Sequence, residues 1–172
     1  MPNPGGPPLL FLDIDGTLIP FGGDPRQYSN AQSGNWASDN PLLARIDPDL
    51  GPRLLALRCD LVWATTWLDD ANREVSPVLG LPVLPVVPWP DVPEDEQDAR
   101  MGLHWKTRAL VEWASGRSFI WVDDELTDAD RSWVAAHHPG PALLHRVEAA
   151  RGLTSGDVDA IARWIVRVTP DP

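Results

Sequence analysis

The sequence of 172 residues contains a single cysteine, Cys59, and no apolar run as long as a membrane-spanning helix. One cysteine cannot form a disulfide within the chain, and low cysteine usage is typical of reducing compartments. A helix that crosses a membrane needs about 20 mostly apolar residues. No basic segment precedes the first apolar run, so a secretory signal is not indicated. We therefore expect a soluble, cytoplasmic protein without a membrane partner.

Lysine is almost missing, since Lys106 is the one lysine among 14 cationic residues. In a chain that otherwise uses arginine, it marks either a site that needs a compact ammonium or simple drift in a GC-rich genome. Acidic residues dominate and give a formal net charge of −11. Extensive binding of nucleic acid is not expected, because it needs clustered basic residues. The negative net charge does not exclude a phosphorylated substrate, because a bound cation can make the electrostatic potential at the site positive.

The composition, 43% hydrophobic and 23% charged, is that of a globular protein, and we expect one domain over residues 1–172. Short apolar runs alternate with helical patterns, which predicts a parallel α/β sheet with right-handed crossovers. The expected fold is a three-layer, Rossmann-like sheet of five strands in the order 3-2-1-4-5. The expected strands are 9–13, 61–65, 83–87, 118–122 and 142–147, and the expected helices are 48–57, 68–79, 104–114, 128–136 and 155–168.

Two long polar segments, 19–40 and 88–103, fit neither pattern. Long loops in compact domains are often functional, and both segments follow strand ends, where open α/β sheets bind ligands. We expect them to act as loop lids. The nine tryptophans divide accordingly: five fall within expected strands and helices, and four could shape a substrate pocket. These four are Trp36, Trp67, Trp89 and Trp105.

Polar side chains gather where the expected strands end, and these ends converge at the switch point of a doubly wound sheet. They include four carboxylates, which cannot all stay ionised in a dry crevice without a compensating charge. Mg²⁺ supplies such a charge and accepts a few protein oxygens together with a substrate phosphate. One carboxylate could then attack phosphorus while another transfers protons. The side chains are Asp13, Asp15, Thr65, Thr66, Lys106, Asp123 and Asp124.

Four segments carry a resemblance to a known family. The stretches "FLDIDGTL", "LVWATTW", "HWKTRALVEW" and "FIWVDDE" resemble, in order, the four motifs of the haloacid-dehalogenase-like (HAD) phosphohydrolases. The resemblance covers the chain from Leu9 to about Val147. It implies that Asp13 is the nucleophile and a metal ligand. It also implies that Asp15 is the general acid/base and binds the metal through its backbone carbonyl.

The same resemblance implies roles for the other polar residues. Thr65 and Lys106 would bind the phosphoryl group, with backbone donors from the turn at Ile14–Asp15 and from Thr66. Asp123 would be a metal ligand, supported by Asp124, and Mg²⁺ would be the cofactor. An aspartate at position 15 favours phosphate transfer over dehalogenation. The ordinary alternatives are that the aspartates form turns and that the two threonines cap a helix.

Neither gap between the motifs is long enough for a full cap domain, so the chain is similar to the capless members of the family. Such members tend to act on large substrates, or to have their active site closed by a partner subunit. In the second case the protein would be a homo-oligomer. The expected activity is that of a Mg²⁺-dependent phosphatase that forms an aspartyl-phosphate. Two alternatives stay open. One is a phosphatase acting on a macromolecular end, either a nucleic-acid 3′ or 5′ phosphate or a phosphoprotein. The other is a non-catalytic HAD-fold binding or assembly domain.

Overall fold

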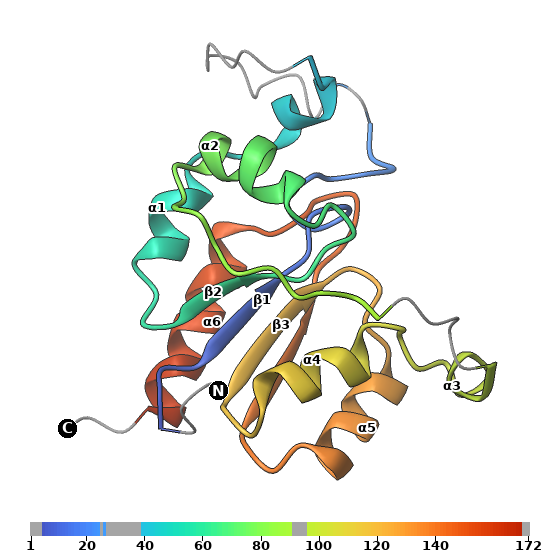
Figure 1. Ribbon diagram of the computed structural model, residues 1–172. Helices are drawn as coiled ribbons and strands as arrows, with labels where there is room; N and C mark the ends of the chain where they lie inside the picture. Colours follow the sequence, from blue (N-terminus) through green and yellow to red (C-terminus); the bar gives the residue numbers. More distant parts are fainter. Residues whose placement is uncertain (1–4, 25, 27–38, 91–95, 170–172) are drawn as a thin grey trace.

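The structure, a computed structural model, describes residues 5–24, 26, 39–90 and 96–169. Four parallel strands form one sheet in the order β2-β1-β3-β4, with β1 and β3 at its centre (Figure 1). A parallel α/β sheet was expected, and this part of the prediction is confirmed. The strands are β1 (Leu9–Leu12), β2 (Asp60–Trp63), β3 (Phe119–Asp123) and β4 (Ala142–Arg146).

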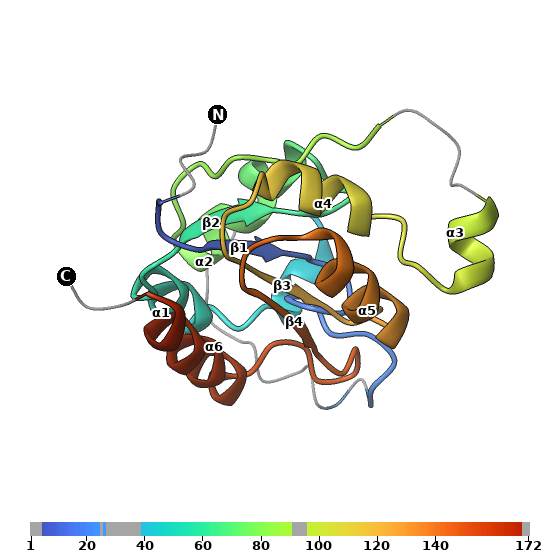
Figure 2. The ribbon, with the colours of Figure 1, turned by 90° about the horizontal axis from the view of Figure 1, so that it is seen from below.

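Helices cover both faces of the sheet, as in a Rossmann-like fold. Figure 2 shows α1 and α6 together on one side and α4 and α5 on the other. None of the helices in the described ranges is long and apolar enough to cross a membrane. The helices are α1 (Leu50–Leu55), α2 (Ser76–Leu79), α3 (Glu96–Met101), α4 (Thr107–Ala114), α5 (Asp128–His137) and α6 (Ser155–Val168), with a 3₁₀ helix at Pro41–Arg45 and a π-helical turn at Ala71–Val75.

The central strand β1 divides the core into two apolar clusters. Leu10 and Leu12 point to one face and pack in a cluster that includes Ile161 of α6. Leu9 and Phe11 point to the other face, in a cluster that includes Leu110 of α4. Each of the four strand residues is at most 3% exposed. A strand buried on both faces explains why its sequence reads as a continuous apolar run.

The prediction of five strands is wrong, because residues 83–87 do not form a strand. Only Val86 bridges to β2, opposite Trp63. Two hydrogen bonds hold this bridge: Trp63 N–H to the Pro85 carbonyl, and Val87 N–H to the Trp63 carbonyl, each 2.9 Å. Prolines at 82, 85 and 88 have no N–H, so a regular ladder cannot extend along the segment.

A side-chain amide fixes the part of this segment that the ladder does not reach. Asn72, in the π-helical turn, donates from Nδ2 to the Leu84 carbonyl and accepts the Leu84 N–H at Oδ1, both at 2.9 Å. Its Oδ1 also accepts Nε1 of Trp63 at 3.1 Å. Asn72 therefore pairs with Leu84 in the way that a neighbouring strand would.

The two expected lids lie partly outside the described residues, namely at 25, 27–38 and 91–95, and Trp36 falls among these. The expectation of a loop throughout 88–103 is wrong for residues 96–101, which form α3. Acidic Glu96 and Asp98 stand in its first turn, where they favour the helix dipole. Arg108 of α4 donates to the Asp98 carboxylate, with Nη2 2.6 Å from Oδ1. This ion pair between Asp98 and Arg108 connects α3 to α4.

We predict that Asn72→Ala lowers the free energy of unfolding by about 2 kcal/mol, because buried Trp63 Nε1 and Leu84 N–H would each lose an acceptor. Urea unfolding of the variant, followed by far-UV circular dichroism, measures this change. Arg73→Ala is the matched control, since Arg73 is the next residue but is exposed. Equal stability of the two variants would show that Asn72 does not hold the proline-rich segment.

Candidate functional site

The first strand places Asp13 at the carboxyl edge of the sheet. Its N–H donates to the Val122 carbonyl of β3 at 3.2 Å, and the residue is 6% exposed. The chain then turns sharply, because the Ile14 carbonyl accepts the Ile19 N–H at 2.9 Å. Thr17 Oγ1 donates to Asp13 Oδ2 at 3.4 Å. The turn and the neighbouring strand together fix the position of the Asp13 carboxylate.

The third strand delivers a second carboxylate to the same edge. Asp123 is the last residue of β3 and is 1% exposed. Its Oδ2 accepts Nε1 of Trp121 at 3.2 Å, and its Oδ1 accepts the Glu125 N–H at 3.0 Å. Asp124 follows and is half-buried, and Arg146 Nε donates to its backbone carbonyl at 3.1 Å. The carboxylate of Asp123 is therefore held at both oxygens, whereas Asp124 is held through its backbone carbonyl.

Lys106 lies between the two strand ends. Its Nζ is 2.6 Å from Asp13 Oδ1 and 2.9 Å from Asp123 Oδ2. The three side chains are almost fully buried, at 5%, 9% and 1% exposure for Lys106, Asp13 and Asp123. The structure thus brings the single lysine into contact with the carboxylates that end β1 and β3.

The pKa values show how crowded the site is with carboxylates. Burial raises the pKa of Asp13 to about 7, and the charge of Asp123 adds to this, while Lys106 opposes it. Burial disfavours the ammonium of Lys106, but the attraction of Asp13 and Asp123 raises its pKa above the ordinary value. Burial and the charge of Asp123 also raise the pKa of Asp124. One ammonium does not neutralise these carboxylates, so a further positive charge would stabilise their ionised forms.

The carboxylates fit a divalent cation such as Mg²⁺. Oxygens of Asp13, Asp123 and Asp124 lie within 4.8 Å of one another, close enough for one ion. Gly16 leaves space for the Asp124 carboxylate, because a Cβ at position 16 would lie 2.4 Å from Asp124 Oδ2. Oxygen ligands are the kind that Mg²⁺ prefers. The structure therefore places these three predicted metal ligands together.

Asp15, the predicted acid/base, faces the same cavity and has a partner that the sequence did not indicate. Trp67 Nε1 donates to Asp15 Oδ2 at 3.0 Å. This bond orients the carboxyl group of Asp15.

The two threonines that follow β2 are placed differently from one another. Thr65 is 1% exposed, and its Oγ1 accepts the Trp67 N–H at 3.2 Å. Trp89 Nε1 donates to the Thr65 carbonyl at 2.9 Å. Thr66 is exposed and lines the cavity, whereas Thr65 does not. Thr65 shapes the turn after β2, and Thr66 is the threonine that meets the cavity directly.

His104 and Asp130 contribute to the site through contacts that the sequence analysis did not predict. His104 Nδ1 accepts the Lys106 N–H at 3.1 Å, and its Nε2 is 3.3 Å from Glu125 Oε2. Asp130 is fully buried and accepts the His104 N–H and Thr107 Oγ1, both at 2.7 Å. These bonds fix the backbone on both sides of Lys106.

The role of Asp130 as part of a helix cap can be predicted from the sequence. Thr127 and Asp130 form a capping box at the start of α5, and the spacing of a threonine and an acidic residue three positions on is its signature. The sequence predicts the cap but not the contact with His104, because that contact joins segments 26 residues apart.

Five of the seven predicted residues, all except Thr65 and Asp123, line a cavity of 280 Å³ at the carboxyl ends of the strands. It combines carboxylates, one ammonium and two aromatic side chains. It is lined by Asp13, Asp15, Gly16, Phe21, Thr66, Trp105, Lys106, Asp124 and Glu125.

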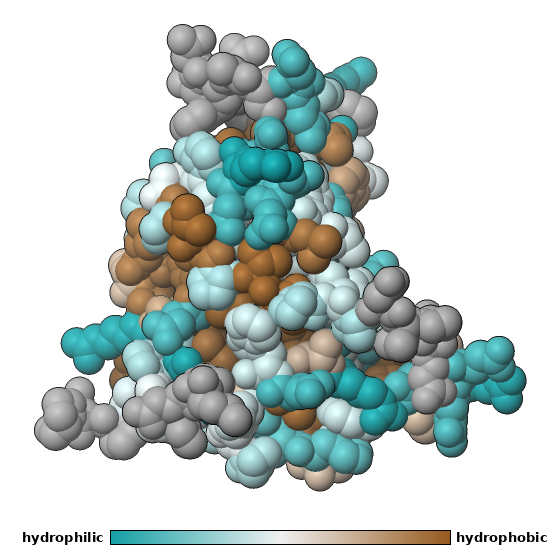
Figure 3. All heavy atoms as spheres, in the orientation of Figure 1, coloured by the Kyte–Doolittle hydropathy of each residue, from teal (hydrophilic) through white to brown (hydrophobic). Residues whose placement is uncertain are grey.

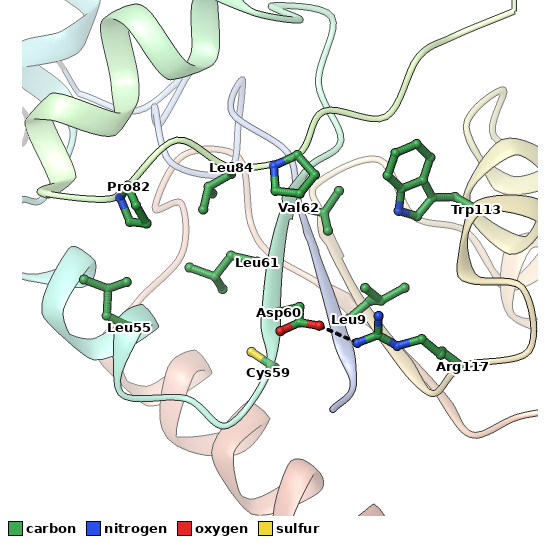
Figure 4. A pocket seen from close by; sticks show the side chains of 11 residues that line it. Leu9, Leu55, Cys59, Asp60, Leu61, Val62, Pro82, Leu84, Trp113 and Arg117 are labelled. Atoms are coloured by element: carbon green, nitrogen blue, oxygen red, sulfur yellow. Dashed lines mark hydrogen bonds and ion pairs between the residues drawn. The ribbon is translucent and has the colours of Figure 1, made fainter. Parts of the chain in front are cut away.

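A larger groove of 730 Å³ lies elsewhere, along β2 (Figure 4). Its walls are mostly apolar, and Figure 3 shows apolar residues gathered on the face where β2 lies. Its charged groups, Asp60 and Arg117, pair with each other at 2.6 Å. Burial, followed by the charge of Asp60, raises the pKa of the Cys59 thiol in this groove to about 12, so the thiol stays protonated. This groove offers no reactive group, and the candidate site is the smaller cavity.

We predict that Gly16→Ala weakens Mg²⁺ binding roughly tenfold or more, because the new Cβ would displace the Asp124 carboxylate. Isothermal titration with MgCl₂ measures the affinity. Gly22→Ala is the matched control, since Gly22 also has a positive φ, of 79° against 72°, but has no atom within 4 Å of an added Cβ. Both variants carry similar backbone strain, so an equal loss of Mg²⁺ affinity would contradict a role for Asp124.

Comparisons with known proteins concern the fold and the family of the chain. The HAD domain of effector protein Lem4 from Legionella pneumophila superposes with a TM-score of 0.54 at 12% sequence identity, covering 97% of each chain. At that identity the likeness shows the fold alone. A search of curated protein sequences found no match. A family model described as the HAD domain in Swiss Army Knife RNA repair proteins matches residues 9–158. The resemblance to HAD-like proteins is thereby confirmed, and the chain belongs to this family of HAD domains.

Proposed function

We propose that the protein is a metal-dependent phosphomonoesterase that acts through an aspartyl-phosphate on Asp13. The observation that carries the proposal is the buried contact of Lys106 with both Asp13 and Asp123 beside a third carboxylate, Asp124. A purely structural ion pair would not need this excess of negative charge at the edge of a cavity. Membership in a HAD family supports the same chemistry.

The residues of the site would have two roles, metal binding and phosphate binding. Asp13, Asp123 and Asp124 would hold Mg²⁺, with the Asp15 carbonyl as a further ligand. When bound, Mg²⁺ offsets the charge of the substrate phosphate and of the carboxylates. Lys106 and Thr66, with backbone N–H groups of the turn after Asp13, bind the phosphoryl oxygens. Positioning and charge neutralisation supply most of the catalysis in phosphoryl transfer.

The reaction has two steps on this chain. A carboxylate oxygen of Asp13 attacks phosphorus, the ester P–O bond breaks, and the Asp15 carboxyl gives its proton to the leaving oxygen. The Asp15 carboxylate then takes a proton from water, whose oxygen attacks phosphorus. The bond between phosphorus and Asp13 breaks, which releases inorganic phosphate and restores both residues. Trp67 keeps the Asp15 carboxyl oriented in both steps.

A second candidate is the removal of phosphate from a nucleic-acid end. The name of the matching family refers to RNA repair proteins, which favours it, whereas the net charge of −11 opposes it. Activity on a 3′- or 5′-phosphorylated oligonucleotide, without activity on small phosphate esters, would decide for this candidate. The non-catalytic alternative predicts Mg²⁺ binding without hydrolysis of either kind of substrate.

We predict that Asp13→Asn abolishes Mg²⁺-dependent hydrolysis of an aryl phosphate, because an amide cannot act as the nucleophile. Release of inorganic phosphate measures the activity, and EDTA should remove the activity of the unmodified protein. Asp128→Asn is the control, since Asp128 is an exposed aspartate at the start of α5. Activity of Asp13→Asn at the level of the control would refute the mechanism.

We predict that Lys106→Arg lowers kcat at least roughly 100-fold although it conserves charge. The ammonium contacts two carboxylates at once with a side chain that is 5% exposed, and the larger, planar guanidinium would not keep both contacts at these distances. Steady-state kinetics on the aryl phosphate test this, with Arg100→Lys as a surface exchange of the same two residue types. Full activity of Lys106→Arg would show that any cation suffices at this position.

A further inference from the structure

An indole forms one wall of the catalytic cavity. Trp105 precedes Lys106, lines the cavity, and is 39% exposed. Lys106 Nζ lies 5.6 Å from the centre of the Trp105 ring. A phosphate held by Lys106 would therefore lie beside this ring, and the group esterified to the phosphate would pass close to it.

Two neighbouring rings contact the indole of Trp105 and fix its orientation. The ring of Trp89 meets Trp105 edge-on, with 4.8 Å between the ring centres and an interplanar angle of 74°. The Trp89 ring is anchored in turn by its bond to the Thr65 carbonyl. His104 stacks against Trp105 at 5.7 Å and 27°. A large apolar ring held so firmly at a cavity wall loses little freedom on binding a ligand.

A second aromatic ring lines the same cavity. Phe21 is half-buried there, and the Arg45 guanidinium lies 5.7 Å from its ring centre. The other lining groups are mainly carboxylates, which repel an acidic leaving group. A neutral aromatic ring is attracted by the two aromatic walls and is not repelled by the carboxylates.

From this geometry we propose that Trp105 is a stacking platform for the leaving group, and that the substrates are phosphate monoesters whose leaving group carries an aromatic ring. The proposal rests on the proposed phosphatase function and specifies its substrate class. The ring is either an aryl group attached near the phosphate or the base of a nucleoside monophosphate. Both present the same flat π-surface to the indole.

Binding of non-hydrolysable ligands tests the proposal without turnover. Benzylphosphonate and cyclohexylmethylphosphonate have similar size, but only the first is aromatic. With Mg²⁺ present, we expect the unmodified protein to bind benzylphosphonate about tenfold more tightly, as measured by isothermal titration. Trp105→Leu should remove this preference and Trp105→Phe should keep part of it. Trp113→Leu, on α4 but lining the other groove, should leave the preference unchanged.

A second pair of ligands distinguishes the two sources of the ring. AMP and ribose 5-phosphate are compared on Asp13→Asn, which should not hydrolyse them. A preference for AMP that Trp105→Leu removes assigns the platform to a nucleobase. A preference confined to benzylphosphonate assigns it to an aryl group.

Equal binding of the members of both pairs, or a preference that survives Trp105→Leu, would overturn the inference while leaving the phosphatase function intact. Failure of all four ligands to bind, together with no hydrolysis of aryl phosphate, would overturn both. Thermal unfolding of each variant shows whether it is folded at the titration temperature.

Discussion

The contact of the Lys106 ammonium with Asp13 and Asp123 is the interaction on which the site depends. It joins residues 93 and 17 positions apart in the sequence, at the ends of the two central strands. Because β1 and β3 are neighbours, their terminal carboxylates would repel each other in a buried edge without a cation between them. The ammonium permits the sheet to bring these carboxylates together, and Asp124 then adds negative charge that a metal ion can use.

Polar bonds outside the motifs keep that ammonium in place. Asp130 binds the backbone of His104 and the hydroxyl of Thr107, on either side of Lys106. His104 accepts the Lys106 N–H and reaches Glu125, which follows β3. These bonds link the start of α4 to the start of α5. They also link Lys106 to the segment that follows β3. The buried part of this network, from Asp130 to His104 and Thr107, makes the position of Lys106 specific.

The aromatic residues around the cavity have separate tasks. Trp67 orients Asp15, Trp121 donates to Asp123, and Trp89 supports Trp105 at the cavity wall. The N–H groups of three of these indoles donate to oxygens of the site or of its supporting turn, namely those of Trp67, Trp121 and Trp89. The larger groove along β2 has no comparable arrangement, since its charged pair is satisfied internally. The convergence of charged groups, and not the volume, is therefore the reason for choosing the smaller cavity as the candidate site.

The sequence by itself determined the parallel α/β fold, the two-sided burial of β1 and the identity of the polar residues at the strand ends, because these follow from local periodicity and from motif order. It could not determine that residues 83–87 form one bridge, since the outcome depends on the Asn72 side chain pairing with the backbone of Leu84 where the ladder stops. Nor could it show that Thr66 rather than Thr65 lines the cavity, or that Trp67 binds Asp15. Those features arise from contacts between segments distant in the chain, whose directions only the packed tertiary structure fixes.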